Sequence, residues 1–401
     1  MEKFLFKMEN TIQNYAWGSK TSIASLFGID NSNNQPQAEI WMGAHPNGCS
    51  KVQTSDNTVL LSELIESDKA SFLTRETAEK FGELPYLFKV LAAENALSIQ
   101  VHPNKQEAEA GFKKEDQLGI ARTDALRNYR DPNHKPELVY ALTPYQAMNG
   151  FRSFDEIIEF FSALLSQCQI AKIAALLAEL ECEKTPKGLE AFFVGILSLG
   201  RQEKQEALDA LLTFSSQQPE GENSPFSVVV ELAETYPGDI GLFAPLMLNV
   251  ITLEPGQAMY LDARTPHAYL KGTALEVMAN SNNVLRAGLT AKHIDIDELA
   301  KCTLFVEKPY HSLLMAPKQQ GCRQVYPVPV PDFKFDCITC TTNEMIEVSS
   351  AEILFAIDGD VHITHEAGEQ ATLHKGQSLF IPAYAKQYQL SSEGRVARVY
   401  N

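Results

Sequence analysis

The amino-acid sequence predicts a mainly β protein with an α-helical insertion. Short apolar runs broken by Gly, Pro and Asn fill residues 1–150, helical periodicity fills residues 151–240, and strand-like runs resume in residues 241–320. Because the β pattern flanks the helices on both sides, the simplest architecture is a β-barrel or sandwich interrupted by a helical domain. Residues 321–401 contain further short strands and predict a second, smaller all-β domain.

The composition is that of an ordinary globular protein. Of 401 residues, 44% are hydrophobic and 21% are charged, which excludes collagen-like and disordered chains. The net charge of −17 repels phosphate backbones and anionic lipids, so we expect neither nucleic acid nor a membrane as a partner. The sequence shows no bilayer-spanning apolar run and no signal-peptide core, so we expect a cytoplasmic location. These properties are compatible with a monomer but do not define the oligomeric state.

The cysteines do not form a disulfide framework. Seven of them, an odd number, are scattered along the chain and are expected to be reduced thiols. Cys337 and Cys340 form an isolated C-x-x-C motif within FDCITCTT, a segment that alternates like a strand. Because no second pair accompanies this motif, a structural position is favoured over a metal or redox role.

The helical region carries recognisable helix starts. Ser153 and Glu156 form a capping box ahead of IIEFFSALL, and Thr185 and Ser224 each precede a first-turn proline. The helices are expected to end at YPGD, residues 236–239, where strand-like sequence resumes with LMLNVITL.

The last β region contains turn sequences at Asp358-Gly359 and Lys375-Gly376. An Asp-Gly pair between apolar runs predicts a β-hairpin. The segments ILFAIDGDVHIT and HKGQSLFIPA also echo the Pro-Gly turn and strand of residues 255–261, which indicates two related β folds.

A strand with polar side chains on one face is the first candidate site. Side chains two residues apart share a face of a strand, so LSIQVH places Ser98, Gln100 and His102 together. The residues expected on the opposite face are Leu97, Ile99 and Val101. An ordinary strand with one solvated face explains the same pattern equally well.

Two further segments supply residues that can bind a metal. In NHKPE the proline holds Lys135 extended and Glu137 begins the next strand, so the two side chains are expected to lie close together. His267 leads from a turn into another strand. Two imidazoles, from His102 and His267, and the Glu137 carboxylate make a catalytic zinc set, to which Gln100 can add an amide oxygen. The competing interpretation is a solvated loop and structural histidines.

Several long motifs resemble one enzyme family. YRDPNHKPE at residues 129–137 and HAYLKGTALEVMANSNNVLRAGLTAKHID at residues 267–295 resemble the signatures of type I mannose-6-phosphate isomerases, and QNYAWGS, SIQVHP and YPGDIGLFAPLMLNV are similar as well. The similarity covers most of residues 4–300 in order. It implies a catalytic cupin-type β-barrel, a helical insertion and a second cupin-like, jelly-roll domain at residues 321–401. The implied substrates are the sugar phosphates mannose 6-phosphate and fructose 6-phosphate.

The resemblance also implies roles for individual residues. One zinc ion per chain is implied to be bound by Gln100, His102, Glu137 and His267. The catalytic arginine of the family falls on Arg286. The residues expected to contact the substrate are Lys89, Ser98, Tyr269, Arg286 and Lys292, and Lys135 is implied to lie nearby.

The implied reaction moves a proton between C1 and C2 of the sugar through a cis-enediolate. A cation near O1 and O2 stabilises the developing charge, and Arg286 suits this because its guanidinium stays charged. The candidates for the general base are His134, Lys135, Glu276 and Lys292. The first two are favoured because they lie beside Glu137.

Three segments depart from the family pattern. Asn282 occupies a position where the family usually has aspartate, and an amide cannot take a proton during ring opening. Residues 262–264 read Asp-Ala-Arg where the family tends to have Pro-Ala-Gly, so we expect a changed turn before His267 and a retained metal. Ala291 also stands where the family has proline.

Two other classes of protein stay open. One is a non-catalytic, metal-containing sugar-phosphate sensor on the same fold, because a fold does not define a function. The presence of Lys135, Arg286 and Lys292 argues against it. The other is an iron-dependent cupin oxygenase, which uses two histidines and a carboxylate but would not need the long sugar-phosphate motifs.

Overall fold

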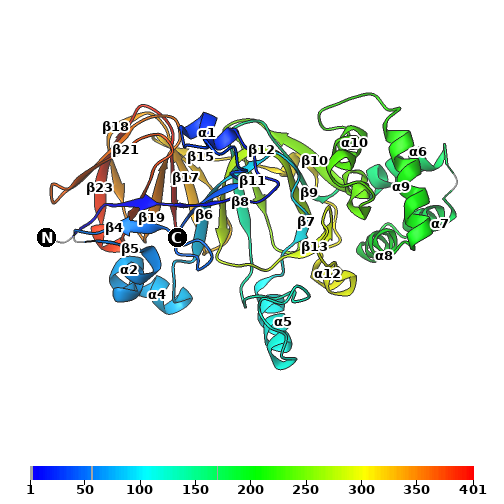
Figure 1. Cartoon of the computed structure of the whole chain (residues 1–401), viewed down its shortest axis with the longest axis horizontal. Helices are drawn as coiled ribbons and strands as arrows, with labels where there is room; N and C mark the ends of the chain where they lie inside the picture. Colours follow the sequence, from blue (N-terminus) through cyan, green and yellow to red (C-terminus); the bar gives the residue numbers. More distant parts are fainter. Residues whose placement is uncertain (1–2, 56, 169) are drawn as a thin grey trace.

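The computed structural model describes residues 3–55, 57–168 and 170–401. Three sections follow one another along its long axis (Figure 1). Strands that include the C-terminal region lie at one end, a second set of strands lies in the middle, and helices lie at the other end. The prediction of a sheet-rich protein with a helical insertion is therefore confirmed.

Strands in the described residues form three sheets, of eleven, nine and four strands. The eleven-stranded one, here the central sheet, contains β2 (Thr11–Gln13), β3 (Glu39–Met42), β6 (Tyr86–Ala93), β7 (Ile99–Val101), β8 (Glu137–Ala141), β9 (Tyr145–Phe151), β10 (Leu248–Leu253), β11 (Ala258–Leu261), β12 (His267–Ala279), β13 (Leu285–Gly288) and β14 (Leu314–Met315). None of the three sheets closes on itself within the described residues.

The nine-stranded sheet, here the terminal sheet, joins both ends of the chain. It contains β1 (Phe6–Glu9), β4 (Lys51–Gln53), β5 (Thr58–Leu60), β15 (Lys318–Gln320), β16 (Arg323–Tyr326), β17 (Lys334–Ile338), β19 (Glu352–Ala356), β22 (Ser378–Ile381) and β24 (Val396–Tyr400). The small sheet contains β18 (Thr341–Glu347), β20 (Val361–His365), β21 (Gln370–Leu373) and β23 (Gln387–Ser392). Phe6 pairs with Phe380, so the first strand belongs to the sheet built mostly from the C-terminal region.

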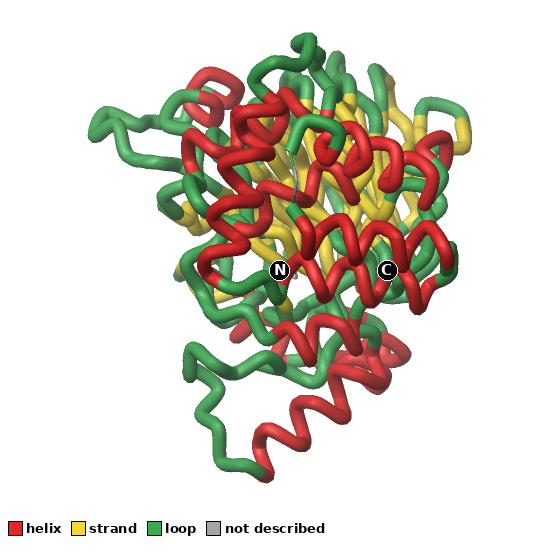
Figure 2. Tube along the Cα trace, turned by 90° about the vertical axis from the view of Figure 1, so that its right-hand side faces the viewer, coloured by secondary structure: helices red, strands yellow, loops and turns green. Residues whose placement is uncertain are grey.

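The helices fall into two groups. Those outside the insertion are α1 (Ser22–Phe27), α2 (Leu61–Ser67), α3 (Lys69–Leu73), α4 (Arg75–Phe81), α5 (Lys105–Gln117), α11 (Ala244–Met247), α12 (Ile296–Cys302) and the short η1 (Ile240–Phe243), η2 (Tyr310–Ser312) and η3 (Ala383–Ala385). The insertion contains α6 (Phe154–Leu165), α7 (Ala171–Cys182), α8 (Pro186–Leu197), α9 (Arg201–Ser215) and α10 (Pro225–Thr235). Figure 2, a view from the helical end, shows these helices in front of the strands.

The predicted helix starts are confirmed. Ser153 caps α6, with its side chain accepting from the Glu156 N–H and the Glu156 carboxylate returning to the Ser153 N–H. Thr185 caps α8 by accepting from the Gly188 N–H ahead of a first-turn proline. Ser224 stands at the N-cap of α10 but makes no side-chain capping bond. None of the helices in the described residues combines the length and apolar character needed to cross a bilayer.

A bend in β12 gives the central sheet two packed halves. The first part of β12 pairs with β7 and β9, and the second part, from Gly272 on, pairs with β6 and β8. Gly272 has φ 112°, and a Cβ there would lie 2.3 Å from the Pro144 carbonyl oxygen, so only glycine fits this bend. The inner faces of the two halves enclose an apolar cluster that includes Val139, Tyr145 and Leu253.

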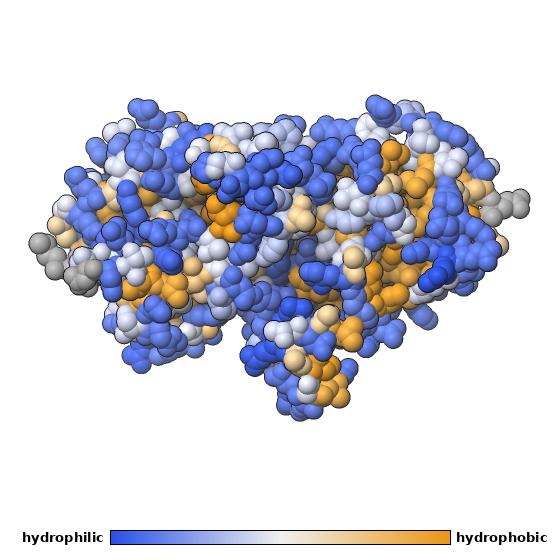
Figure 3. Space-filling model, viewed as in Figure 1, coloured by the Kyte–Doolittle hydropathy of each residue, from blue (hydrophilic) through white to orange (hydrophobic). Residues whose placement is uncertain are grey.

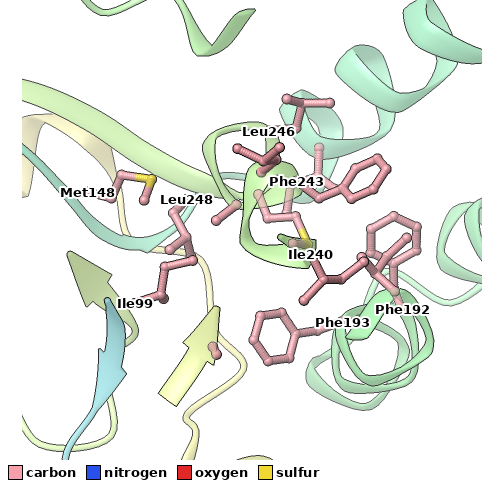
Figure 4. Packing of buried hydrophobic residues seen from close by; sticks show 14 of the residues in the cluster. Ile99, Met148, Phe192, Phe193, Ile240, Phe243, Leu246 and Leu248 are labelled. Carbon is pink, nitrogen blue, oxygen red and sulfur yellow. The ribbon is translucent and has the colours of Figure 1, made fainter. Parts of the chain in front are cut away.

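Apolar cores also cover the outer faces of the central sheet. Figure 4 shows Ile99, Met148 and Leu248 from its strands packed with Phe192 and Phe193 of α8, which anchors the helical insertion. On the other side, Phe88 and Val277 share a core with strands of the terminal sheet. Each fully buried side chain of this size contributes about 1.5–3 kcal/mol. Hydrophilic residues cover most of the face in Figure 3, with orange patches over the helical end.

Two expectations for the β regions need correction. Asp358-Gly359 does not form a hairpin, because β19 pairs within the terminal sheet and β20 within the small sheet. Gly359 also lacks the positive φ that a tight hairpin turn requires. Leu97 precedes β7 and packs in the inner cluster, not on the outer face with Ile99 and Val101. The two cysteines of the C-x-x-C motif differ in environment, since Cys337 is buried and Cys340 is exposed.

Candidate metal centre and substrate cleft

Three side chains that can bind a metal meet between the two halves of the central sheet. His102 directly follows β7, Glu137 begins β8 and His267 begins β12, and all three are buried. His102 Nε2 lies 3.2 Å from Glu137 Oε1, and His267 Nε2 lies 3.7 Å from Glu137 Oε2. One ligand atom from each residue lies within 4.8 Å of the others, so the three side chains are close enough to hold one ion. His102, Glu137 and His267 are called the metal group below.

The hydrogen bonds of both imidazoles direct a lone pair into this group. His102 Nδ1 lies 2.7 Å from the Asn283 carbonyl oxygen and His267 Nδ1 lies 2.9 Å from that of Thr265. A carbonyl only accepts, so each Nδ1 carries the proton and each Nε2 is an acceptor. Burial lowers the pKa of His102 and lowers that of His267 to about 3, which keeps both rings neutral. His102 Nε2 has no hydrogen-bond partner. Three acceptors facing one another fit a cation, and the carbonyls of Asn283 and Thr265 orient the two imidazoles for it.

The carboxylate of Glu137 is stabilised in its charged form. The Lys135 ammonium lies 2.8 Å from its Oε1, and the Tyr269 hydroxyl donates to its Oε2 at 2.5 Å. Burial alone would raise the pKa of Glu137, but the contacts of its carboxylate, the Lys135 ammonium first among them, hold this pKa well below its ordinary value. The predicted proximity of Lys135 and Glu137 is therefore present, and Tyr269 reaches the same carboxylate.

Gln100 lies beside the metal group in the register of the strands. Its Cα pairs with that of His267 on one side and with that of Arg286 on the other. Directly opposite residues share a face of a sheet, so the three side chains form one row on the inner face. Gln100, Ser98 and Arg286 also line the same cleft.

A cleft of about 720 Å³ opens beside this row. Arg130, Arg286 and Lys292 line it, and in the part of the chain that the structure describes none of the three has a salt-bridge partner. Burial and the charge of Arg130 lower the pKa of Arg286, and the charge of Arg286 lowers the pKa of Lys292. Uncompensated positive charge in a chain of net charge −17 favours an anionic ligand.

Lys89 behaves differently from these cations because two carboxylates surround it. Its ammonium lies 2.7 Å from Glu276 Oε2 and 3.7 Å from Glu39 Oε1, and it stands over the Trp41 ring at 5.3 Å. Burial disfavours the ammonium, but these carboxylates raise the pKa of Lys89 above its ordinary value. Burial raises the pKa of Glu276 to about 7, since Glu137 adds to this effect and Lys89 offsets only part of it.

His134 is the one favoured base that the structure turns away from the metal group. Its Nε2 lies 3.0 Å from Asp332 Oδ1, and it does not line the cleft. Sequence reasoning missed Glu39, His45 and Arg130, which do line it. The alternation of Glu39 and Trp41 on a buried strand could have indicated the first.

Arg264 occupies the turn position before His267 where the family tends to have glycine. Its φ of 69° lies in the left-handed region, where a non-glycine residue costs about 1 kcal/mol or more. Its N–H donates to the His102 carbonyl at 2.7 Å, and its side chain lies 3.3 Å from Glu107. These contacts hold the strained turn next to His267, whose position in the metal group is retained.

A buried metal group at a cationic cleft between sheet layers defines a metal-dependent protein that binds a small anion. Models of the phosphomannose isomerase type I catalytic domain, the type I helical insertion domain and the mannose-6-phosphate isomerase cupin domain match residues 5–154, 164–248 and 323–401. The chain belongs to the type I phosphomannose isomerase family.

Individual relatives match along the whole chain. Mannose-6-phosphate isomerase of Escherichia coli K12 is 47% identical over 397 residues, which cover 98% of this chain and 99% of the relative. The Homo sapiens enzyme is 33% identical over 408 residues, with 94% and 93% coverage. A crystal structure of a zinc-bound mannose 6-phosphate isomerase is similar with a TM-score of 0.92, 46% identity and full coverage of both chains.

Proposed function

We propose that this protein interconverts mannose 6-phosphate and fructose 6-phosphate as a zinc-dependent isomerase. The observation that carries the proposal is a metal group of three acceptors beside a cleft in which Arg130, Arg286 and Lys292 have no acidic partner among the described residues. The metal group suits a Lewis acid acting on sugar oxygens, and the free cations suit a phosphate. Family membership supplies the reaction that joins the two.

The zinc ligands in this proposal are Gln100, His102, Glu137 and His267. Two neutral imidazoles and one carboxylate leave the bound ion with a net positive charge and an open position. When bound, zinc would polarise the sugar oxygens as a Lewis acid. Tyr269 and Lys135 hold the Glu137 carboxylate through hydrogen bonds to its two oxygens.

The substrate phosphate is assigned to the far part of the cationic cleft. Lys292 and Arg130 line the cleft with no acidic partner among the described residues, and Ser98 lines it as well. Arg286 stands between this part and the metal group because it pairs with Gln100. Its guanidinium is therefore assigned to the enediolate oxygens, where charge develops. Lys89, already paired with Glu276, is assigned to sugar hydroxyls.

Proton transfer is assigned to Lys135, with Glu276 as a second titratable group. The neutral amine of Lys135 takes the C2 proton as the C1–C2 double bond of the enediolate forms, and the ammonium returns it to C1. Glu276, whose pKa is about 7, can take up or release a proton near neutral pH, whereas Lys89, whose pKa is raised, keeps its proton. His134 is assigned to positioning, because Asp332 holds its ring at 3.0 Å.

The finer architecture belongs to the same proposal. We assign residues 1–150 and 241–320 to a cupin-type catalytic barrel, residues 151–240 to the helical domain and residues 321–401 to a jelly-roll cupin domain. The two facing halves of the central sheet and the cupin match at residues 323–401 support this division. We also propose that the protein works in the cytoplasm as a monomer.

A coupled assay combined with metal analysis tests the proposed function. The purified protein should contain about one zinc per chain, lose activity to a chelator, and convert mannose 6-phosphate far faster than free mannose. Lys292→Ala should raise KM for the phosphorylated sugar, while Lys172→Ala, at an exposed position of α7, should not. Zinc binding without any turnover would instead identify a sugar-phosphate sensor. Equal turnover of both sugars would contradict the phosphate site.

A further inference from the structure

His45 lines the cleft, but the reaction scheme above gives it no role. It lies in the turn that follows β3, and only 3% of its surface is exposed. Its ring packs edge-on against Trp41 with centroids 5.0 Å apart. The Lys89 ammonium stands over the same Trp41 ring at 5.3 Å, so His45 lies on the side of the cleft that is assigned above to the sugar rather than to its phosphate.

The backbone fixes which nitrogen of His45 carries the proton. The Asn47 N–H donates to His45 Nδ1 at 3.2 Å, and a backbone N–H can only donate. Nδ1 is therefore the acceptor and Nε2 carries the hydrogen. A second proton on Nδ1 would break this bond and place two hydrogens against each other, so the turn itself disfavours the imidazolium.

Asn282 is the partner on the other side of the ring. Its side chain forms a hydrogen bond with the imidazole, and this bond favours the protonated nitrogen, as an acceptor does. Its backbone is fixed independently, because the Asn282 N–H donates to Asp131 Oδ2 at 2.6 Å. Burial, Lys89 and Lys135 lower the pKa of His45 to about 4, so the ring stays neutral at neutral pH.

We propose that His45 is a further substrate-contacting residue, whose fixed Nε2–H donates a hydrogen bond to a reacting oxygen of the sugar, with Asn282 as its acceptor when no sugar is bound. This inference rests on the proposed isomerase function. The imidazole gives up no proton: it exchanges one acceptor, the Asn282 amide oxygen, for a sugar oxygen that becomes more negative in the enediolate. A neutral donor of this kind stabilises developing charge without a change of protonation state.

The aspartate-to-asparagine departure from the family fits this role. A carboxylate at position 282 would hold the Nε2–H more strongly and favour the imidazolium, since a charged acceptor stabilises a charged donor. An amide is a weaker acceptor, and it leaves the donor available to the sugar. Asn282 is thus matched to a neutral His45 and not to a proton-transfer role of its own.

Steady-state kinetics on two variants with a matched control test the contact. His45→Phe keeps the ring shape without the donor and should lower kcat about a hundredfold, as removal of one oxyanion donor does, with KM changed less than about threefold. His45→Gln keeps an N–H donor and should recover at least about tenfold of this loss. The control is His362→Gln, at an exposed position of the small sheet, which should match the wild type. Zinc content and thermal unfolding of each sample exclude loss of metal or fold. A His45→Phe enzyme within about threefold of wild-type kcat, or equal losses in Phe and Gln variants, would overturn the proposal.

Nitrogen NMR of the imidazole rings separates this inference from the isomerase function. Comparison of wild type with His45→Gln assigns the ring, and the signals should show a neutral Nε2–H tautomer at pH 7. Addition of fructose 6-phosphate should shift the Nε2 resonance and leave the Nδ1 resonance nearly unchanged. An Nδ1–H tautomer, an imidazolium or an unchanged Nε2 resonance would overturn the role of His45 even in an enzyme with full isomerase activity.

Discussion

Two regions of this protein bury charged side chains, and they satisfy them in opposite ways. In the terminal sheet, Arg398 donates to Glu352 Oε2 at 2.6 and 2.9 Å, lies 3.4 Å from Asp336 Oδ2, and also donates to the Glu347 carbonyl. The Tyr388 hydroxyl donates to the remaining Glu352 oxygen. In the metal group, by contrast, three acceptors face one another, and Arg130, Arg286 and Lys292 in the adjoining cleft have no acidic partner among the described residues.

The difference separates structure from chemistry. A buried cluster in which each charge meets an opposite one needs no ligand, so its interactions contribute to the free energy of folding. A cluster with surplus acceptors or surplus cations is neutralised only when a ligand binds, so its interactions contribute to the free energy of ligand binding. Variants of the Arg398 cluster should therefore lose folding stability, whereas variants of the metal group or the cleft should lose ligand binding or activity.

The largest effect is expected at the metal ligands. His267→Ala and Glu137→Ala each remove one of the three facing acceptors, so zinc content and activity should fall together, with activity lower by about a thousandfold. Metal analysis and the coupled assay on the same samples check this. His362→Ala, which removes an exposed histidine, is the control. Full zinc occupancy in both ligand variants would show that the ion binds elsewhere.

Arg398→Met should disrupt the buried cluster of Arg398, Glu352 and Asp336 without changing catalysis. Removing one partner leaves the Glu352 and Asp336 carboxylates buried without compensation, which costs about 3–5 kcal/mol of folding free energy. The kcat/KM of the folded enzyme should stay unchanged at low temperature. Denaturant unfolding checks the first expectation, with Arg75→Met in an exposed pair of α4 as a control that costs less than about 1 kcal/mol. A loss of activity without a loss of stability would contradict the comparison.

Arg286→Ala tests the cleft at a cation that has no acidic partner among the described residues and is not a proposed metal ligand. Its charge is expected to act mainly in the transition state, so kcat should fall about a hundredfold while zinc and fold are retained. Arg286→Lys should rescue only part of this, because an ammonium keeps the charge but not the planar fork. Near-normal kcat, or a loss that simply follows lost zinc, would assign Arg286 to structure.

The smallest effect concerns the pH dependence of stability without metal. The pKa of His267 is about 3 in the folded chain, below the ordinary value of about 6.5 in the unfolded chain. The unfolded state therefore binds the proton first, and stability should fall as the pH drops below about 6.5, by up to about 1.4 kcal/mol per pH unit. Unfolding in a chelator between pH 7 and 5 measures this slope, and His267→Gln should reduce it. An equal slope in both proteins would mean that His267 is not held neutral.

The parts of the site that sequence could predict are those carried by local pattern. Alternation in LSIQVH placed Gln100 and His102 on one face, and the proline in NHKPE placed Lys135 beside Glu137, as the 2.8 Å contact shows. Both follow from the geometry of a few consecutive residues. The assignment of roles to Gln100 and Arg286 stays a prediction, although their register places them side by side.

The parts that sequence could not predict depend on pairing between distant strands. Lys89 meets Glu276 because β6 and β12 pair in one register, and a shift by one residue would have turned the two side chains to opposite faces. His134 meets Asp332, which lies far along the chain, so its neighbour in sequence, Glu137, gave no guide to its direction. The Asp358-Gly359 turn fits a hairpin locally, but its flanking strands enter different sheets.

The strand order of the terminal sheet also sets the order of events during synthesis. β24, the last strand of the chain, lies between β17 and β19, and β1, the first strand, pairs with β22. Before β22 has been translated, β1 lacks this partner. A chain that lacks residues 396–400 has a gap between β17 and β19. The terminal sheet can therefore be completed only after translation has passed its final strand, whereas the helical insertion, whose contacts are mostly local, can form earlier.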